Sequence, residues 1–176
     1  MIKNALGSKL QVTLAIIKPH VIQAPHALKG IRERICKSGF FILKTNRIYL
    51  QKERAENFYS EHKGKFFFSR LVSFMCSGHC DIHILARENA IQHWRDVLGP
   101  TKVYHTVFTH PESIRGCFGL SDTRNAAHGS DSEASAEKEI NFFFPQINLC
   151  NLLKNSQKAL ESGSIKFDED KFEHQL

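Results

Sequence analysis

The sequence has no long apolar run, and this absence excludes a membrane-spanning helix. None of its hydrophobic stretches approaches the roughly 20 apolar residues that such a helix needs. The sequence also lacks the G-x-x-x-x-G-K-[ST] phosphate loop and the H-R-D and D-F-G motifs of protein kinases. We therefore expect no membrane span, and any chemistry on phosphate must depend on other residues.

Tryptophan and methionine are scarce, with one and two residues, whereas phenylalanine occurs 14 times. A chain of 176 residues with this composition predicts one domain with a Phe-rich core. The five cysteines are an odd number, and no N-x-S/T site or signal peptide is visible, which predicts an intracellular protein. No acidic residue precedes Glu33, as in many imported mitochondrial proteins, so we expect the mitochondrion or the cytoplasm.

Negative charge is in the minority, because the formal net charge is +6. Residues 145–176 carry four lysines against five acidic residues, a net charge of −1, so the rest of the chain carries +7. A basic body favours polyanionic partners such as nucleotides, nucleic acid or anionic lipid. Because the basic residues are scattered and form no stripe, nucleic acid is disfavoured among these partners.

Hydrophobic periodicity predicts alternating strands and helices. β-branched and apolar residues indicate strands at residues 11–17, 40–50, 80–87 and near 125–128. Apolar residues at helical spacing, closed by glycine or proline, indicate helices at residues 26–39, 52–64, 65–78, 88–99 and 130–144. Residues 100–124 are rich in turn residues, and we expect a mostly irregular, functional loop there. Residues 146–176 are polar, and we expect them to be loosely packed.

The order of these elements contains a β-α-β-β-α-β pattern. This pattern is typical of a ferredoxin-like α/β sandwich of the α+β class, in which helices cover one face of a four-stranded antiparallel sheet. We predict this fold for residues 1–145, followed by a polar C-terminal extension at residues 146–176.

His128 lies between small residues in the segment RNAAHGSDS (124–132). Ser130 and Glu133 have the spacing of a capping box, so we expect Ser130 to be the N-cap of the following helix. The free N–H groups and the positive dipole end of that helix would then face the histidine, and anions bind at such helix ends. A nucleophilic ring beside an anion site is suited to accepting and donating a phosphoryl group.

Four residues in CSGHCDIH are spaced like zinc ligands, namely Cys76, His79, Cys80 and His83. Tetrahedral zinc sites usually combine two ligand pairs that are distant in the sequence. The pleat of the predicted strand would also point His79 and His83 to one face and Cys80 to the other. We therefore favour ordinary packed residues over a metal site.

Five blocks of the sequence, in the same order, resemble the nucleoside diphosphate kinase family. They are TLAIIKP, the FY and FFFSRLV segments, WRDVLGPT, SIRG and RNAAHGSDSEASAEKEI, between residues 11 and 145. The N-x-x-H-G-S-D-S signature is highly specific, and the divergent type 6 branch is the most similar part of the family. The resemblance implies transfer of the γ-phosphate of a nucleoside triphosphate to a histidine and then to a nucleoside diphosphate, with ping-pong kinetics.

The resemblance implies roles for the residues of the predicted catalytic group. His128 matches the nucleophile, and Glu139 matches the carboxylate that orients the ring through its other nitrogen. Lys18 and Tyr59 complete this group. Ser130 matches a residue beside the histidine and belongs to the nucleotide-binding set. A neutral imidazole is available near pH 7, as a nucleophile requires.

A second set of matched residues is implied to bind the nucleotide. The members that contact phosphate are Lys18, Tyr59, Arg95, Thr101 and Arg115. The two arginines suit this role because guanidinium groups bind phosphate bidentately. Asn125 matches the residue that reaches the ribose, and Phe67 the aromatic ring on which the base stacks, which implies broad base tolerance. Mg²⁺ is the implied cofactor, held through the phosphates of the nucleotide, so we expect no metal site built by the protein.

Three departures from the family pattern bear on these expectations. The family usually has aspartate after Lys-Pro, where this chain has His20, so Lys18 must be held differently. Asp122 replaces a usually apolar residue near the base. The segment between Thr101 and Arg115 is longer than in the shorter family members, in which it packs between subunits. We therefore doubt the usual hexamer, and a homo-oligomer of another size stays open.

Three functions fit the sequence. The first is an active nucleoside diphosphate kinase that binds ATP and other nucleoside tri- and diphosphates. The second is a weakly active or inactive family member that acts as a protein-interaction module, which the three departures and the polar tail favour. The third is nucleic-acid binding through the basic body, but a nucleotide pocket needs the same positive charge and explains it equally well.

Overall fold

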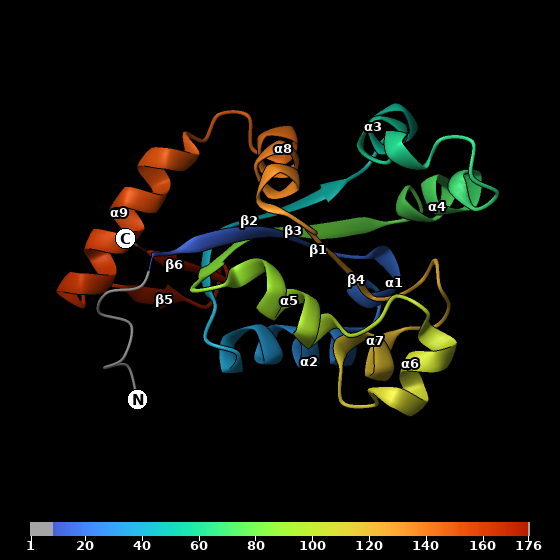
Figure 1. Cartoon of the computed structure of the whole chain (residues 1–176), viewed down its shortest axis with the longest axis horizontal. Helices are drawn as coiled ribbons and strands as arrows, with labels where there is room; N and C mark the ends of the chain where they lie inside the picture. Colours follow the sequence, from blue (N-terminus) through green and yellow to red (C-terminus); the bar gives the residue numbers. More distant parts are fainter. Residues whose placement is uncertain (1–8, 176) are drawn as a thin grey trace.

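Strands rich in β-branched and apolar residues form one antiparallel sheet in the computed structural model of the protein, which describes residues 9–175 (Figure 1). The strands are β1 (Gln11–Ile17), β2 (Phe41–Tyr49), β3 (His79–Arg87) and β4 (Ala127–Gly129), in the order β2-β3-β1-β4. Each neighbouring pair is antiparallel, so the predicted ferredoxin-like fold is confirmed. Residues 1–8, on which the expectation of mitochondrial import partly rests, and residue 176 lie outside the described residues.

Helices cover both faces of this sheet, so the expectation of a single covered face is wrong (Figure 1). The first face is covered by α3 (Lys52–Phe58), α4 (Phe68–Met75) and α8 (Glu133–Phe143), and the second by α2 (Pro25–Lys37) and α5 (Ala90–Leu98). The central strand β1 explains this arrangement. Leu14 and Ile16 point to the first face, whereas Ala15 and Ile17 point to the second, and all four are buried. A strand that is apolar on both sides needs cover on both sides.

The segment from residue 100 to 124 contains two short helices, which corrects the expectation of a mostly irregular loop. They are α6 (Val103–Thr109) and α7 (Ile114–Phe118), and Ser113 caps α7 by accepting a hydrogen bond from the N–H of Gly116. Helices of this length are too short to give a clear periodic pattern, and the turn residues between them dominate the composition. No helix within residues 9–175 combines the length and the apolar character needed to cross a bilayer.

The helix after His128 begins later than predicted, because a different serine caps it. α8 starts at Glu133, and the hydroxyl of its N-cap Ser132 accepts a hydrogen bond from the N–H of Ser135 at 3.2 Å. Ser130, the predicted N-cap, is instead fully buried and bonds to distant parts of the chain. A buried tertiary contact therefore outweighs the local capping-box pattern.

The C-terminal extension is folded against the sheet, which corrects the expectation of loose packing. It forms α9 (Leu149–Ser162) and a hairpin of β5 (Lys166–Asp168) and β6 (Glu173–Gln175). Phe172 is 5% exposed and joins the core of the second face, and the guanidinium carbon of Arg32 lies 4.5 Å from the centre of its ring. One buried aromatic residue thus anchors this segment to the core, a contact that its polar composition did not predict.

The same hairpin covers the edge of β2, which is one of the two outer strands of the sheet. The Glu173 carboxylate accepts a hydrogen bond from the N–H of Thr45 at 2.6 Å. Nδ1 of His174 accepts another from the N–H of Ile42 at 3.0 Å. These side chains satisfy backbone groups that an uncovered edge strand would offer to another chain.

Replacement of Phe172 by alanine tests this anchor. We expect Phe172→Ala to lower the free energy of unfolding by roughly 3 kcal/mol, because a buried aromatic ring is lost from the core. Phe167→Ala in the same hairpin is the matched control, because Phe167 is 39% exposed, and we expect a loss below about 1 kcal/mol. Urea denaturation followed by circular dichroism measures both values, and equal losses would show that the hairpin is not anchored through Phe172.

Candidate active site

Pairing of β4 with β1 fixes the position of His128. The histidine lies opposite Ile16 in the antiparallel register, and its carbonyl oxygen accepts a hydrogen bond from the indole N–H of Trp94 at 3.1 Å. Gly129 packs against the same indole, where a Cβ atom would lie 2.4 Å from the ring. The glycine after the histidine is therefore required for β4 to approach α5 so closely.

The His128 ring is held by a carboxylate and a serine. Its Nε2 lies 3.0 Å from each carboxylate oxygen of Glu139 on α8. The Ser130 hydroxyl donates to Glu139 at 2.6 Å and accepts from the N–H of Leu14 at 3.1 Å, which ties the carboxylate to β1. Because an ionised carboxylate only accepts hydrogen bonds, Nε2 carries the hydrogen and Nδ1 keeps its lone pair. The His128 side chain is 24% exposed and thus accessible to a ligand.

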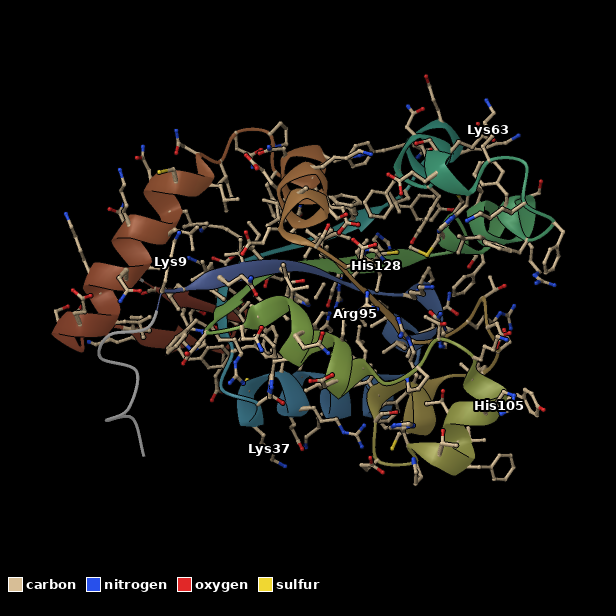
Figure 2. The ribbon with its side chains drawn as sticks, viewed as in Figure 1. Lys9, Lys37, Lys63, Arg95, His105 and His128 are labelled. Carbon is tan, nitrogen blue, oxygen red and sulfur yellow. The ribbon has the colours of Figure 1, made fainter. Side chains whose placement is uncertain are left out.

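Two adjoining cavities meet at His128. The smaller one, of about 450 Å³, brings together most of the residues predicted from the sequence: Lys18, Tyr59, Phe67, Thr101, Arg115, Asn125 and His128. The larger one, of about 770 Å³, is lined by Arg95 and Glu139 and shares Tyr59, Thr101, Arg115 and His128 with the first. Figure 2 shows Arg95 of α5 and His128 of β4 near the middle of the molecule. Ser130 lies behind Glu139 and lines neither cavity.

Lys18 is a buried cation at the end of β1. It is 5% exposed, and its Nζ donates a hydrogen bond to the carbonyl oxygen of Thr123 at 3.2 Å. Burial, together with the nearby Arg115 guanidinium, lowers the pKa of Lys18 to about 7. No acidic group within residues 9–175 forms an ion pair with it. An anion in the cavity would therefore favour the charged form of this lysine.

Arg115 is a second buried cation, positioned by backbone carbonyl groups. Its guanidinium donates to the carbonyl oxygen of Gly99 at 2.6 Å and to that of Ala127 at 3.1 Å. Burial, with a smaller effect of Arg95, lowers the pKa of Arg115 to about 10, so the group stays positive near pH 7. Carbonyl oxygens orient the guanidinium but leave its charge free to act on a ligand.

Three buried polar atoms at the smaller cavity have no hydrogen-bond partner within residues 9–175, namely the Tyr59 hydroxyl, Nε of Arg115 and Oδ1 of Asn125. Unpartnered polar groups of this kind are costly in a protein interior, and native structures retain them mainly at functional sites. Burial also raises the pKa of Tyr59, which keeps its hydroxyl protonated as a hydrogen-bond donor. The cavity is thus suited to a polar, anionic ligand.

His62 is a cavity residue that the sequence analysis missed. It lines both cavities, its ring stacks on Tyr59 with 6.1 Å between ring centres, and it meets the edge of Phe67 at 5.5 Å. Burial lowers its pKa, and the charges of nearby lysines act in the same direction. Its position three residues after Tyr59, in the turn that follows α3, was the available signal, since neighbouring turns of chain share a face.

His20, which departs from the family pattern, contacts Phe118 and Phe74. It forms no hydrogen bond with Lys18. Its Nε2 lies 3.3 Å from the carbonyl oxygen of Phe118, and its ring packs against Phe74. Burial lowers the pKa of His20, so the ring is neutral near pH 7 and gives Lys18 no opposite charge.

The residues spaced like zinc ligands are separated by the pleat of β3. Cys80 packs in the core of the first face, whereas Nδ1 of His83 lies 2.8 Å from the hydroxyl of Thr45 and His79 is exposed. Burial lowers the pKa of His83 to about 4. Within residues 9–175, no three His, Cys, Asp or Glu side chains are grouped closely enough to hold a metal ion.

Comparison with known proteins extends these observations. The sequence model of the nucleoside diphosphate kinase family matches residues 11–149. Nucleoside diphosphate kinase 6 of Xenopus tropicalis is 41% identical over 167 residues, which cover 95% of this chain and 93% of that protein.

Solved structures of nucleoside diphosphate kinases are also similar to this chain. The nucleoside diphosphate kinase of Aquifex aeolicus superposes with a TM-score of 0.73 at 38% identity, covering 77% of this chain and 95% of that chain. The enzyme of Halobacterium salinarum, in complex with CDP, superposes with a TM-score of 0.71 at 30% identity, covering 76% and 87%. The protein therefore belongs to the nucleoside diphosphate kinase family and resembles its divergent type 6 branch.

Proposed function

We propose that the protein transfers the γ-phosphate of a nucleoside triphosphate to a nucleoside diphosphate through a phosphohistidine at His128. The observation that carries this proposal is the contact of Nε2 with both oxygens of Glu139 at 3.0 Å, which leaves Nδ1 as the ring nitrogen not bound to the carboxylate. His128 also lines the same cavity as the buried cations Lys18 and Arg115. Membership of the family supports kinase activity in general. The CDP complex of the Halobacterium salinarum relative supports nucleotide as the ligand.

The reaction consists of two displacements at phosphorus. In the first, Nδ1 of His128 attacks the γ-phosphorus, and the bond to the oxygen that bridges the β- and γ-phosphates breaks, so the diphosphate leaves with the electron pair. The Glu139 carboxylate stabilises the positive charge that develops on the ring through the Nε2–H group. In the second, a terminal phosphate oxygen of another diphosphate attacks the same phosphorus, and the phosphorus–nitrogen bond breaks.

The surrounding residues act by neutralising and orienting phosphate. Phosphoryl transfer depends mainly on positioning and on stabilisation of charge around phosphorus. Lys18 and Arg115 supply positive charge in a buried site, where it is weakly screened. The unpartnered Tyr59 hydroxyl would supply a hydrogen-bond donor, and the unpartnered Oδ1 of Asn125 would accept from the sugar.

The residues of the cavity suit a metal ion that arrives with the nucleotide. Cations, hydroxyls, an amide and a single carboxylate line the smaller cavity, and no group of three potential metal ligands occurs within residues 9–175. Mg²⁺ would therefore be held by phosphate oxygens and water, as this ion prefers. When bound, Mg²⁺ would neutralise part of the negative charge of the phosphates.

Replacement of His128 tests the phosphohistidine. With γ-labelled ATP and Mg²⁺, we expect the wild-type protein to form an acid-labile, alkali-stable phosphoprotein, which then loses its label to added nucleoside diphosphate. His128→Ala removes the nucleophile and should abolish labelling, whereas His26→Ala should not, because His26 is exposed and lines neither cavity. Folded wild-type protein that takes up no label would favour the alternative of a protein-interaction module.

Replacement of Glu139 tests the orientation of the ring. We expect Glu139→Gln to slow phosphohistidine formation roughly 100-fold, because a neutral amide neither fixes the hydrogen on Nε2 nor stabilises a charged ring. Glu137→Gln is the matched control on the same helix, because Glu137 is exposed and outside both cavities. Rapid-quench single-turnover labelling measures the rates, and equal rates for the two variants would remove Glu139 from the mechanism.

The lowered pKa of Lys18 predicts that nucleotide binding takes up a proton. At about pH 8, one unit above the pKa of about 7, most of the free protein carries neutral Lys18. Phosphate groups favour the charged form and raise this pKa, so the complex should gain close to one proton, and the gain should vanish well below pH 7. Titration calorimetry of ADP binding in buffers of different ionisation enthalpy measures the uptake. Lys18→Met should show none, and an unchanged uptake in this variant would assign the proton to another group.

A further inference from the structure

Asp122 is the only acidic side chain that lines the smaller cavity within the described residues 9–175. The other lining residues are mostly cationic, polar or aromatic. A carboxylate in a site for a polyanion repels the phosphates unless it is neutralised or faces a different part of the ligand. The position of Asp122 therefore needs an explanation within the proposed function.

Hydrogen bonds hold Asp122 and its neighbour between two walls of the cavity. Oδ1 of Asp122 accepts from the N–H of Val103 at the start of α6 at 3.1 Å. Thr123 accepts from Nε of Arg70 on α4 at 3.1 Å through its hydroxyl, and from Nζ of Lys18 at 3.2 Å through its carbonyl oxygen. One hydrogen bond thus holds the Asp122 carboxylate to α6, and two more hold the adjacent Thr123 to α4 and to Lys18.

The cavity has a cationic part and an aromatic part. Lys18 and Arg115 line it together with His128, so a phosphate that reacts with the histidine lies in the cationic part. Phe67, the N-terminal neighbour of α4, lines the same cavity and supplies a ring on which a base can stack. Thr123 bonds both to Lys18 and to Arg70 of α4, so the neighbouring Asp122 lies where the cationic part of the cavity meets the wall that carries Phe67.

The Asp122 carboxylate keeps free capacity to accept hydrogen bonds. No lysine, arginine or histidine within residues 9–175 forms an ion pair with it, and its single hydrogen bond there is the one from Val103 to Oδ1. Each carboxylate oxygen has two lone pairs, so both oxygens can accept from a ligand. A ligand group with two adjacent donors would therefore satisfy both oxygens at once.

Guanine is the common base that has two such donors on its Watson–Crick edge, the ring N1–H and the exocyclic N2 amino group. Adenine and cytosine place a ring-nitrogen acceptor beside their amino group, and uracil places its N3–H between two carbonyl oxygens. Each of these acceptors would face the carboxylate and be repelled.

We propose that Asp122 makes the nucleotide site selective for guanine, by accepting hydrogen bonds from N1–H and the N2 amino group of guanosine di- and triphosphates. This inference rests on the proposed function and assigns it a preferred substrate class. Stacking on Phe67 alone would accept any base, whereas a carboxylate at the base edge discriminates by hydrogen bonding. Sites that hydrogen-bond a polar group of the substrate discriminate more strongly than apolar pockets do.

Binding of diphosphates that differ only in the base tests the proposal. Titration calorimetry with GDP, ADP, UDP and XDP in the presence of Mg²⁺ should give a Kd for GDP roughly tenfold below those for the others, because charge-assisted hydrogen bonds are among the strong ones. Asp122→Asn keeps an oxygen for the N–H of Val103 but replaces one acceptor by an N–H donor. This variant should lose roughly tenfold in GDP affinity and gain in XDP affinity, because xanthine has a carbonyl oxygen where guanine has the N2 amino group. Glu112→Gln removes a nearby exposed charge outside the cavity and should leave the order of affinities unchanged.

The possible outcomes separate this proposal from the function on which it rests. Equal affinities for GDP and ADP in a wild-type protein that forms phosphohistidine would overturn the role of Asp122 and leave the kinase activity in place. A uniform gain in affinity for every base in Asp122→Asn would likewise overturn it, since Asp122 would then act only as a general negative charge. Failure of all four diphosphates to bind would overturn the proposed function together with the selectivity.

Discussion

Antiparallel pairing of β4 with β1 is the contact on which the candidate site depends. Three residues of β4 pair with the end of β1, and the N–H of Lys18 extends the ladder by donating to the carbonyl oxygen of Ala126 at 3.0 Å. This pairing brings His128 next to a lysine that is distant in the sequence. It also lets Ser130 connect the backbone of β1 to Glu139. Ring, carboxylate and cation are thus positioned by the sheet, which is more rigid than a loop.

The site keeps buried positive charge without a matching negative charge. Lys18 and Arg115 are oriented by carbonyl oxygens, and burial lowers the pKa of both. Such an arrangement costs stability in the free protein, because desolvation of a charge is not offset by an ion pair. Burial of apolar side chains in two cores, one on each face of the sheet, offsets this loss of stability. An anionic ligand that neutralises the cations then stabilises the folded state as it binds, so the same groups oppose folding and favour binding.

Sequence reasoning was most successful where one pattern dominates. The β-branched run at residues 11–17 coincides with β1, and the order of elements predicted the sheet. It was weakest where a tertiary contact decides the outcome. Ser130 has the spacing of a helix cap, yet its hydroxyl bonds to Glu139 and to β1. Phe172 is one aromatic residue in a polar tail, and only the folded chain shows that it fills the core. His62 belongs to no sequence motif, and only its position in the lining of both cavities identifies it as a candidate site residue.

The replacement of aspartate by His20 changes the charge near Lys18 but leaves the other residues of the candidate site unchanged. A carboxylate after Lys-Pro could pair with Lys18, keep it protonated and compete with phosphate for it. The histidine bonds instead to the carbonyl oxygen of Phe118, and burial lowers its pKa, so it supplies no negative charge. Burial and the Arg115 guanidinium lower the pKa of Lys18, and no ion pair within residues 9–175 opposes them in the free protein. A phosphate bound as proposed would therefore not compete with a carboxylate for Lys18, but Lys18 would have to regain its proton on binding. This departure from the family pattern therefore predicts that nucleotide binding depends more strongly on pH. It does not predict the loss of the proposed phosphate-binding role of Lys18.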